Sequence, residues 1–450
     1  MSTITTGFIA GVPAEVVEHA IPKPVEKTDR IKTVDMVRGV ALLGILLMNI
    51  PIFSFDEIII HDLFTGPHDS TDFKTFEVVL AFFDGTMRGL FSMLFGAGMV
   101  LFLMNKKEKP GGPSVAELYY RRLLWLVLFG LINAYILQWP GDILFYYGLL
   151  GMMLYPFRNS SPKLLIVIAL GFMFIYMGKG LWGYSDTREI RLRYTSAIQA
   201  EKEGKKLTTK QEEDKEAWLN IEKRREPDRE KANENIAEMR GSYAGIFSFL
   251  VPINGRNEFV WMYYWAFWDC LFMMFMGMAF YKLGFFSNSY STKTYSLLLL
   301  LGYGIGIPLG YFYMKGNVDG WYMGAFLDQY RVPPTIVYDI RRLFLCIGHV
   351  SLLMLIYRSR IVPWLMSALA SVGQMAFTNY LMQSIICALF FYGYGLGYYH
   401  TLKYHQIYYV VFSIWVFQLI FSSIWLRYFR FGPFEWTWRT LTYWKKQKML

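Results

Sequence analysis

Residues 30–49 read RIKTVDMVRGVALLGILLMN, and within this stretch a basic, polar approach turns into a long apolar helix. Asp35 and Arg38 stand three residues apart at its start, so on a helix they share one face and can pair. Asn49 stands near its far end. Because a polar side chain at membrane depth is costly unless it is hydrogen-bonded, we expect Asn49 to face the protein interior. The glycines and alanine between these residues favour close contact with another helix.

The whole chain has the composition of a polytopic membrane protein. It contains 450 residues, of which 54% are hydrophobic and 18% aromatic. Apolar segments near the roughly 20 residues needed to cross a bilayer recur along it. We therefore expect an all-α, polytopic helical protein with about ten transmembrane helices. The net charge of +10 comes from Lys and Arg clustered at helix ends, which positive-inside topology explains without a nucleic-acid partner.

Cysteine spacing and motif searches exclude several site types. Cys270, Cys346 and Cys387 all fall within predicted spans and show no CxxC or metal-ligand spacing, so we interpret them as buried thiols and expect no metal. The sequence contains no P-loop, Rossmann fingerprint, HExxH or GxSxG motif. The common soluble chemistries therefore lack the residues that they require.

The distribution of charge predicts four parts. Residues 1–33 form a cytoplasmic N-terminal arm, and residues 34–183 form a membrane bundle of five helices. From 184 to 242 the chain is crowded with Lys, Arg, Glu and Asp, and Pro227 interrupts it, which predicts a charged extracytoplasmic insert of two or three solvated helices. A solvated hairpin is the simpler interpretation of this insert than a docking site. Residues 243–450 form a second bundle of five helices.

The order of the predicted spans fixes a topology. The span at 76–104 ends in NKKEKPGGP, a cytoplasmic connection, and two shorter spans at 120–138 and 143–157 form a hairpin around an outer WPGD turn. The apolar segment 362–392 is longer than one crossing requires, so we expect it to be tilted or broken. An even number of spans places both termini in the cytoplasm.

Four groups of polar residues interrupt the apolar background, and ionisable groups at membrane depth are functional candidates by default. They are Asp35, Arg38 and Asn49; Asp84 and Arg88; Asn133, Gln138 and Asp142; and Asp339, Arg341, Arg342, His349, Gln374, Thr378, Asn379, Tyr380 and Gln383. Each group also has a structural interpretation. Asp84 and Arg88, one turn apart, can form an ion pair that only fixes a helix end. Asn379 and Gln383, also four apart, can bridge helices instead of contacting a substrate.

His349 is the sharpest single candidate for proton transfer. It stands near the middle of its predicted span, and imidazole is the side chain suited to proton transfer near neutral pH. A lone buried histidine is more often a hydrogen-bonding residue of the core, and both interpretations stay open.

Five longer stretches support a resemblance to a known family. They are VDMVRGVALLGILLMN at 34–49, GLFSMLFGAG at 89–98, GDILFYYGLLG at 141–151, GQMAFTNYLMQSIICALFFYGYGLG at 373–397 and WLRYFRFGPFEWTWRTLTYWK at 425–445. On these stretches the chain resembles, nearly end to end, the bacterial YeiB-like family, whose C-terminal half is called domain of unknown function 418. The chain departs from that family at Asn133, where many relatives carry a His, and at Gln374, where many carry an Arg. The resemblance implies a multi-pass protein of the bacterial inner (cytoplasmic) membrane.

The YeiB-like family looks related to membrane acyltransferases such as the heparan-alpha-glucosaminide N-acetyltransferase type, which share an opening Asp-x-x-Arg-Gly helix. The resemblance implies transfer of an acyl group from a cytoplasmic acyl-CoA, the suspected donor substrate, to an unknown acceptor at the outer face. Arg38, Arg121 and Arg122 are then candidates to hold the CoA phosphates. Beyond the lipid bilayer, the expected partners are acyl-CoA and that acceptor, and an oligomer is compatible with the sequence.

Under this resemblance, His349, Asp35 and Asn379 are the candidate catalytic residues, with His349 as the base and amide donors stabilising an oxyanion. The candidate donor- and substrate-binding residues are Arg38, Asn49, Arg88, Asn133, Asp142, Gln374, Tyr380 and Gln383. A transporter of a small or lipid-like substrate is an alternative, because intramembrane charges and glycine-interrupted spans also serve alternating access. A non-catalytic membrane scaffold is a second alternative, in which the polar groups only lock helices together.

Overall fold

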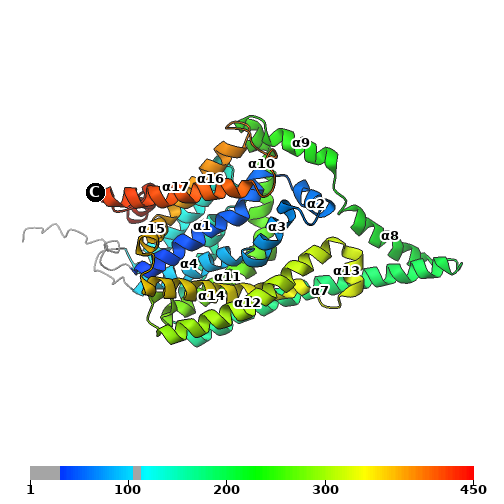
Figure 1. Cartoon of the computed structure of the whole chain (residues 1–450), viewed down its shortest axis with the longest axis horizontal. Coiled ribbons are helices and arrows are strands. Elements are labelled where there is room, and N and C mark those ends of the chain that lie inside the picture. The colour runs from blue at the N-terminus through cyan, green and yellow to red at the C-terminus, as the bar shows by residue number, and fades with distance from the viewer. Residues whose placement is uncertain (1–30, 105–112) are drawn as a thin grey trace, which may run out of the picture.

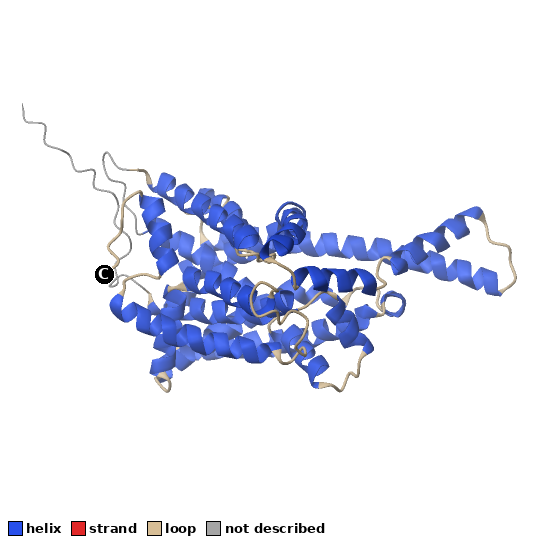
Figure 2. Ribbon diagram, turned by 90° about the horizontal axis from the view of Figure 1, so that it is seen from above, coloured by secondary structure: helices blue, strands red, loops and turns tan. Residues whose placement is uncertain are grey.

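The computed structural model describes residues 31–104 and 113–450, and in these ranges the chain folds into helices and loops without a strand (Figures 1 and 2). The expected all-α, polytopic class is confirmed. Most of the predicted N-terminal arm, up to residue 30, lies outside the described residues, as does most of the connection at 105–113.

The helices follow one another along the chain with short connections. In chain order they are α1 (Lys32–Ser54), α2 (Ile58–Thr65), α3 (Thr71–Phe82), α4 (Thr86–Met104), α5 (Val115–Leu131), η2 (Ile132–Ile136), α6 (Leu144–Met152), η3 (Tyr155–Phe157), α7 (Pro162–Lys202), α8 (Thr209–Lys223), α9 (Arg229–Met239), α10 (Tyr243–Arg256), η4 (Asn257–Ala266), α11 (Phe267–Lys282), η5 (Phe285–Ser287), α12 (Thr292–Trp321), α13 (Met323–Gln329), η6 (Pro334–Val337), α14 (Tyr338–Ser359), α15 (Pro363–Gln374), α16 (Ala376–Phe391), α17 (Ile407–Tyr428) and α18 (Pro433–Tyr443).

In the part of the chain that the structure describes, seven helical stretches are long and apolar enough to cross a membrane. The bent pair of α15 and α16 adds an eighth if it is counted as one span. The sequence predicts about ten spans, and the difference lies in the hairpin around the WPGD turn. There α5 continues without a break into η2 but carries Glu117, Arg121 and Arg122 in its first half, and α6 has only 9 residues, so neither is among these stretches.

Helix α1 lies in the middle of the bundle and packs against α4, α15, α16 and α17. Its glycines permit this packing, as the sequence predicts. A Cβ atom on Gly39 would lie 2.0 Å from the carbonyl oxygen of Leu369, and one on Gly373 of α15 would lie 1.8 Å from the carbonyl oxygen of Asp35. Real Cβ contacts are never that short, so the two helices touch backbone to backbone.

A second close crossing joins α4 and α11. A Cβ atom on Gly96 would lie 2.0 Å from Met274 O, and one on Gly277 would lie 1.9 Å from Met93 O. The contact expected for the small residues at 96–98 therefore forms at Gly96, with a glycine of the partner helix opposite. These two crossings hold α1, α4, α11 and α15 at fixed separations.

The apolar segment 362–392 is broken, as expected. Helices α15 and α16 meet at Met375 with a bend of 82°. The break leaves the N-terminal end of α16 inside the protein, where its backbone N–H groups require acceptors.

The charged segment 184–242 is continuous with the membrane bundle. Helix α7 has 41 residues and runs past the predicted boundary at residue 183 without interruption, and α8 and α9 follow it. In Figure 1, α8 and α9 lie at one end of the molecule and the C-terminus lies at the other. Arg191 pairs with Asp328 of α13 at 2.8 Å, so the insert is anchored to the bundle.

Candidate functional site

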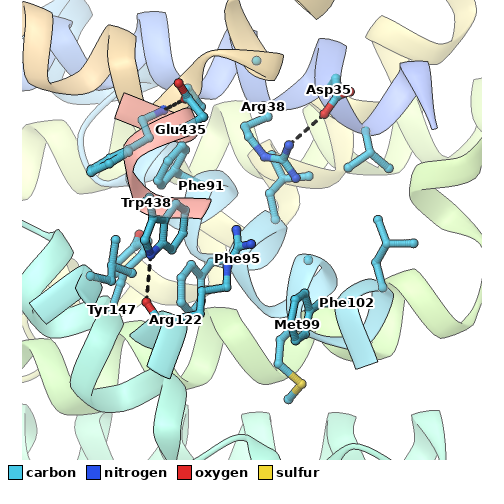
Figure 3. A pocket seen from close by; sticks show the side chains of 18 of the residues that line it. Asp35, Arg38, Phe91, Phe95, Met99, Phe102, Arg122, Tyr147, Glu435 and Trp438 are labelled. Atoms are coloured by element: carbon cyan, nitrogen blue, oxygen red, sulfur yellow. Dashed lines mark hydrogen bonds and ion pairs between the residues drawn. The ribbon is translucent and has the colours of Figure 1, made fainter. Parts of the chain in front are cut away.

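A cavity of about 250 Å³ opens among α1, α4, α5, α6, the α15–α16 junction and α18. Most of its wall is apolar and aromatic, including Phe91, Leu94, Phe95, Met99, Leu123 and Leu126. Its polar and ionisable lining residues are Asp35, Arg38, Tyr119, Arg122, Tyr147, Gln374, Tyr380, Glu435 and Arg439. Figure 3 shows how side chains from these separate helices converge on it.

Three arginines line the cavity, from α1, α5 and α18. Arg38 donates a hydrogen bond of 2.8 Å to Asp35, which is the ion pair that the sequence predicts. The guanidinium of Arg122 lies 3.9 Å from the ring centre of Trp438, whose indole N–H donates to the Arg122 carbonyl. Arg439 lines the same cavity. Planar guanidinium groups are the preferred partners of phosphate and carboxylate, so the arginine-lined part of the cavity suits an anionic ligand.

Glu435 fixes the broken helix at the cavity wall. One carboxylate oxygen accepts hydrogen bonds from the backbone N–H groups of Phe377 (2.7 Å) and Thr378 (3.0 Å), and the other accepts from the Thr378 hydroxyl. Burial raises the pKa of Glu435, and these hydrogen bonds oppose that rise. A residue of the C-terminal helix therefore caps the N-terminal end of α16 and holds Ala376 and Phe377 in the wall.

A buried hydrogen-bond network adjoins the cavity at Tyr380. Tyr380 lines the cavity, and its hydroxyl accepts hydrogen bonds from Trp139 Nε1 (3.1 Å) and Ile143 N (3.2 Å) and donates to Asp142 Oδ1 (3.4 Å). Asn133 Nδ2 donates to the same Asp142 oxygen at 2.8 Å. Two donors thus point at the phenolic oxygen, and its proton points at a carboxylate.

Asp142 lies in the turn between η2 and α6. Burial raises its pKa to about 7, although hydrogen bonds from Asn133 and the Phe145 backbone oppose the rise. A carboxyl group with a pKa in this range is partly ionised near neutral pH and can both accept and return a proton.

The structure brings six of the predicted site residues together. Asp35, Arg38, Gln374 and Tyr380 line the cavity, and Asp142 and Asn133 are linked to Tyr380 through one and two hydrogen bonds, respectively. The amide of Gln374 donates to the Arg430 carbonyl at 3.1 Å, so the group that replaces the family's Arg is neutral and tied to the C-terminal segment.

Other predicted residues lie away from the cavity. His349 on α14 contacts the Tyr303 hydroxyl at 2.8 Å, and it is not among the cavity-lining residues, so its predicted role as a base stays a prediction. Asn379 donates to Ser422 and Gln383 donates to Gln418, which are contacts between α16 and α17. Their geometry favours the bridging interpretation.

Two further candidates are also outside the lining. Asn49 on α1 is half-buried. Arg121 pairs with Glu117 and stacks on Trp444 with a guanidinium-to-ring distance of 4.0 Å. Of the adjacent arginines 121 and 122, therefore, one faces the cavity and the other does not.

The predicted pair of Asp84 and Arg88 does not form. Gly85, with a φ of +66°, ends α3 before α4 begins, so Asp84 and Arg88 do not share one helix. Asp84 lies 3.9 Å from Arg341, and Arg88 lies 3.4 Å from Asp269. The i, i+4 spacing was misleading because the helix is interrupted between the two residues.

Two important carboxylates were missed by the sequence prediction. Asp269 is fully buried and lies 2.6 Å from Arg342, which also contacts Asp339 at 2.6 Å. Glu435 lies within the stretch 425–445, in which no feature of the sequence marks it as a site residue. A carboxylate inside the apolar run FWDCLF was the available signal for Asp269, whereas periodicity carried no signal that Glu435 would contact α16.

Comparisons with known proteins give a family and no activity. Residues 280–445 match the family model described as "Protein of unknown function (DUF418)". The chain is 29% identical to uncharacterized protein YxaH of Bacillus subtilis (strain 168) over 428 residues, 94% of this chain and 96% of that protein. It is 29% identical to uncharacterized protein YeiB of Escherichia coli (strain K12) over 424 residues, 92% of this chain and 96% of that protein.

A third relative, an uncharacterized 39.9 kDa protein in the amylase 3' region of Bacillus acidopullulyticus, is 26% identical over 95% of this chain and 98% of that protein. No solved structure matches. Residues 280–445 therefore match the DUF418 family model, and nearly the whole chain is similar to YeiB and YxaH.

Proposed function

We propose that this protein is a membrane acyltransferase that moves an acyl group from a cytoplasmic acyl-CoA to an acceptor at the outer face. One observation carries the proposal: a single cavity is lined both by three arginines and by Tyr380, whose hydroxyl donates to Asp142. An acyl-CoA likewise combines phosphates, which suit the arginines, with a thioester, on which the Tyr380 hydroxyl can act. The resemblance of the family to membrane acyltransferases points to the same reaction.

The arginine-lined part of the cavity would hold the donor. Arg38, Arg122 and Arg439 come from three different helices, so their guanidinium groups can surround a diphosphate instead of meeting it from one side. The apolar wall of the cavity, with Phe91, Phe95 and Leu126 among its residues, would hold the pantetheine arm and the acyl chain.

The part of the cavity at Tyr380 would carry the chemistry. The acceptor's oxygen or nitrogen attacks the thioester carbonyl, a new bond to that carbon forms, and the carbon–sulfur bond breaks. The acceptor's proton passes to Asp142 through the Tyr380 hydroxyl, and Asp142 then returns this proton through Tyr380 to the departing CoA thiolate. Trp139 Nε1 and Ile143 N, which donate to the Tyr380 oxygen, would stabilise negative charge on it during that transfer.

Label transfer tests the reaction. The full-length protein in lipid nanodiscs is incubated with radiolabelled acetyl-CoA, butyryl-CoA or palmitoyl-CoA and an extract of bacterial envelope lipids and glycans. We expect label to move from CoA to an acceptor with the wild type, and expect Tyr380→Phe to bind the donor but lose transfer. The matched control Tyr303→Phe removes a hydroxyl from outside the cavity and should keep transfer. Absence of transfer from every donor would contradict the proposal.

The orientation of the chain in the membrane is part of the proposal. Donor access from the cytoplasm requires the cavity end, which carries the C-terminus, to face the cytoplasm, and α8 and α9 to face outward. Single cysteines are introduced as Glu216→Cys in α8 and Lys446→Cys near the C-terminus, both at exposed positions. A membrane-impermeant thiol reagent should label the first from outside and the second only after lysis. The reverse pattern would place the donor end on the wrong side.

Transport is a second candidate because of the broken helix. The 82° bend between α15 and α16 leaves a half-helix N-terminus at the cavity, an arrangement common in secondary transporters. Glu435 occupies that terminus. Uptake of an anionic substrate into proteoliposomes without thioester cleavage would favour this candidate over acyl transfer.

A further inference from the structure

Two π-helical segments meet beside Asp142. Helix η2 carries Asn133, and η4 begins one turn after Asn254 of α10. Asn254 Nδ2 donates to the Ala134 carbonyl at 2.7 Å, and the Tyr135 hydroxyl donates to Glu258 Oε2 at 2.9 Å. Wide π-helical turns occur frequently at functional sites because they displace side chains from regular helical positions.

Three buried oxygen atoms at this meeting point lack a donor. Asn133, Asn254 and Glu258 are 0%, 2% and 5% exposed. The Asn133 Oδ1, Asn254 Oδ1 and Glu258 Oε1 atoms accept no hydrogen bond from any residue that the structure describes. Buried polar atoms are nearly always satisfied, so three such atoms in one region require an explanation.

The orientation of the two amides does not remove the problem. The nitrogen of Asn133 faces the Asp142 carboxylate, and the nitrogen of Asn254 faces the Ala134 carbonyl. While Asp142 is ionised, rotating either amide by 180° would place two oxygen atoms against each other. The oxygens are therefore fixed on the side without a donor.

The contacts also link the three side chains to one turn of chain, in η2. Asn133 belongs to that turn, Asn254 is bound to the next residue, Ala134, and Glu258 is bound to the one after, Tyr135. All three unsatisfied atoms are acceptors, and one of them belongs to a carboxylate. A ligand that satisfies them must present positive charge or hydrogen-bond donors, and a single positive charge would balance Glu258.

We propose that Asn133, Asn254 and Glu258 bind a small monovalent cation through these three oxygen atoms. The same chemistry can come from two sources, a hydrated alkali metal ion such as Na⁺ or the protonated amine of a small molecule. Oxygen atoms from amides and one carboxylate are suitable ligands for either one. Because Asn133 also holds Asp142, a cation here is coupled to the proposed catalytic carboxylate, but its binding does not depend on acyl transfer.

Thermal unfolding of the full-length protein in nanodiscs tests the site. Choline chloride, which lacks N–H donors, is replaced at constant ionic strength by NaCl, KCl or methylammonium chloride. We expect at least one of these cations to raise the melting temperature saturably, by about 2 to 5 °C. A response to Na⁺ or K⁺ alone identifies a metal-ion site, and a response to methylammonium alone identifies an amine site.

Matched variants locate the effect. Glu258→Gln and Asn254→Ala should lose the cation-dependent rise, whereas Glu435→Gln, which alters a buried carboxylate with both oxygens hydrogen-bonded, should retain it. Saturable binding of radioactive Na⁺ to the wild type, competed by unlabelled Na⁺ and methylammonium, gives a readout that survives if a variant does not fold. A full rise in Glu258→Gln, or a wild type with neither a cation-specific rise nor saturable binding of Na⁺ or methylammonium, would overturn the proposal.

Discussion

Two groups of arginines and aspartates in this protein use the same residue types in opposite ways. Around Arg342, the carboxylates of Asp269 and Asp339 each lie at 2.6 Å, and all three side chains are almost fully buried. Around the cavity, Arg38 has one carboxylate partner and a side chain that is 25% exposed. Buried charges that pair with one another stabilise the fold, whereas charged side chains that line a cavity remain able to bind a ligand.

The comparison teaches that the presence of a charge in an apolar span does not identify a site. Arg88 and Arg38 were both predicted to bind substrate, and both stand near one end of a long apolar helix. Arg88 lies against Asp269 and Trp265 instead of lining the cavity, while Arg38 lines it. What separates the two is the arrangement of partners from distant parts of the chain.

The largest effect expected on the cavity side is that of Asp142→Asn. Removing the proposed base should lower the rate of acyl transfer by about 10²- to 10⁴-fold. Because burial raises the pKa of Asp142 to about 7, wild-type transfer should fall as the pH drops below that value and the carboxylate is protonated. Rate measurements between pH 5 and 9, with acyl-CoA binding as the control, check this. An unchanged rate in the variant would remove Asp142 from the mechanism.

The buried group formed by Arg342, Asp269 and Asp339 is tested by Arg342→Leu. The change leaves the buried carboxylate of Asp339 without its partner and leaves Asp269 paired with Arg88 alone, and it should lower the free energy of unfolding by about 3–5 kcal/mol. Arg38→Leu, at a half-exposed position, should cost less than about 1 kcal/mol. Denaturation of both variants in the same detergent measures the difference. Equal losses of unfolding free energy in Arg342→Leu and Arg38→Leu would contradict the claim that the buried ion pairs stabilise the fold more than the cavity-lining pair does.

A smaller loss of unfolding free energy is expected for a change at the contact between α18 and α16. Glu435→Gln keeps one acceptor oxygen at the helix N-terminus but removes the charge, and it should destabilise the protein by about 1 kcal/mol. Thr378→Val is the companion variant, since it removes the hydroxyl that donates to the same carboxylate. A double-mutant cycle on the unfolding free energies should show coupling between the two sites, and additive effects would contradict the cap.

Much of the fold could be predicted because it follows from local sequence. Apolar length predicts a polytopic helical protein, the glycines of α1 predict its tight packing, and the excess length of 362–392 predicts a break. The end of the fifth span at residue 183 was not a helix boundary. Beyond it the charged residues continue a helical pattern, so α7 extends through the predicted boundary.

The site could be predicted only in part because it is assembled across long sequence distances. Asp35 and Arg38 are neighbours on one helix and were predicted as a pair. Glu435 caps a helix that begins about 60 residues earlier, and no periodicity reports such a contact. His349 was predicted from its chemical type and its place in the middle of a span, and neither determines which helix face meets the cavity.

Adjacent residues of α5 allow the most direct test of the central claim, that the arginine-lined cavity holds the donor. Binding of acyl-CoA to the full-length protein is measured by equilibrium titration for the wild type, Arg122→Gln and Arg121→Gln. We predict that Arg122→Gln, whose side chain faces the cavity, weakens binding about tenfold, equivalent to about 1.4 kcal/mol, and that Arg121→Gln binds like the wild type. Equal affinities for the two variants, or no binding by the wild type, would contradict the account.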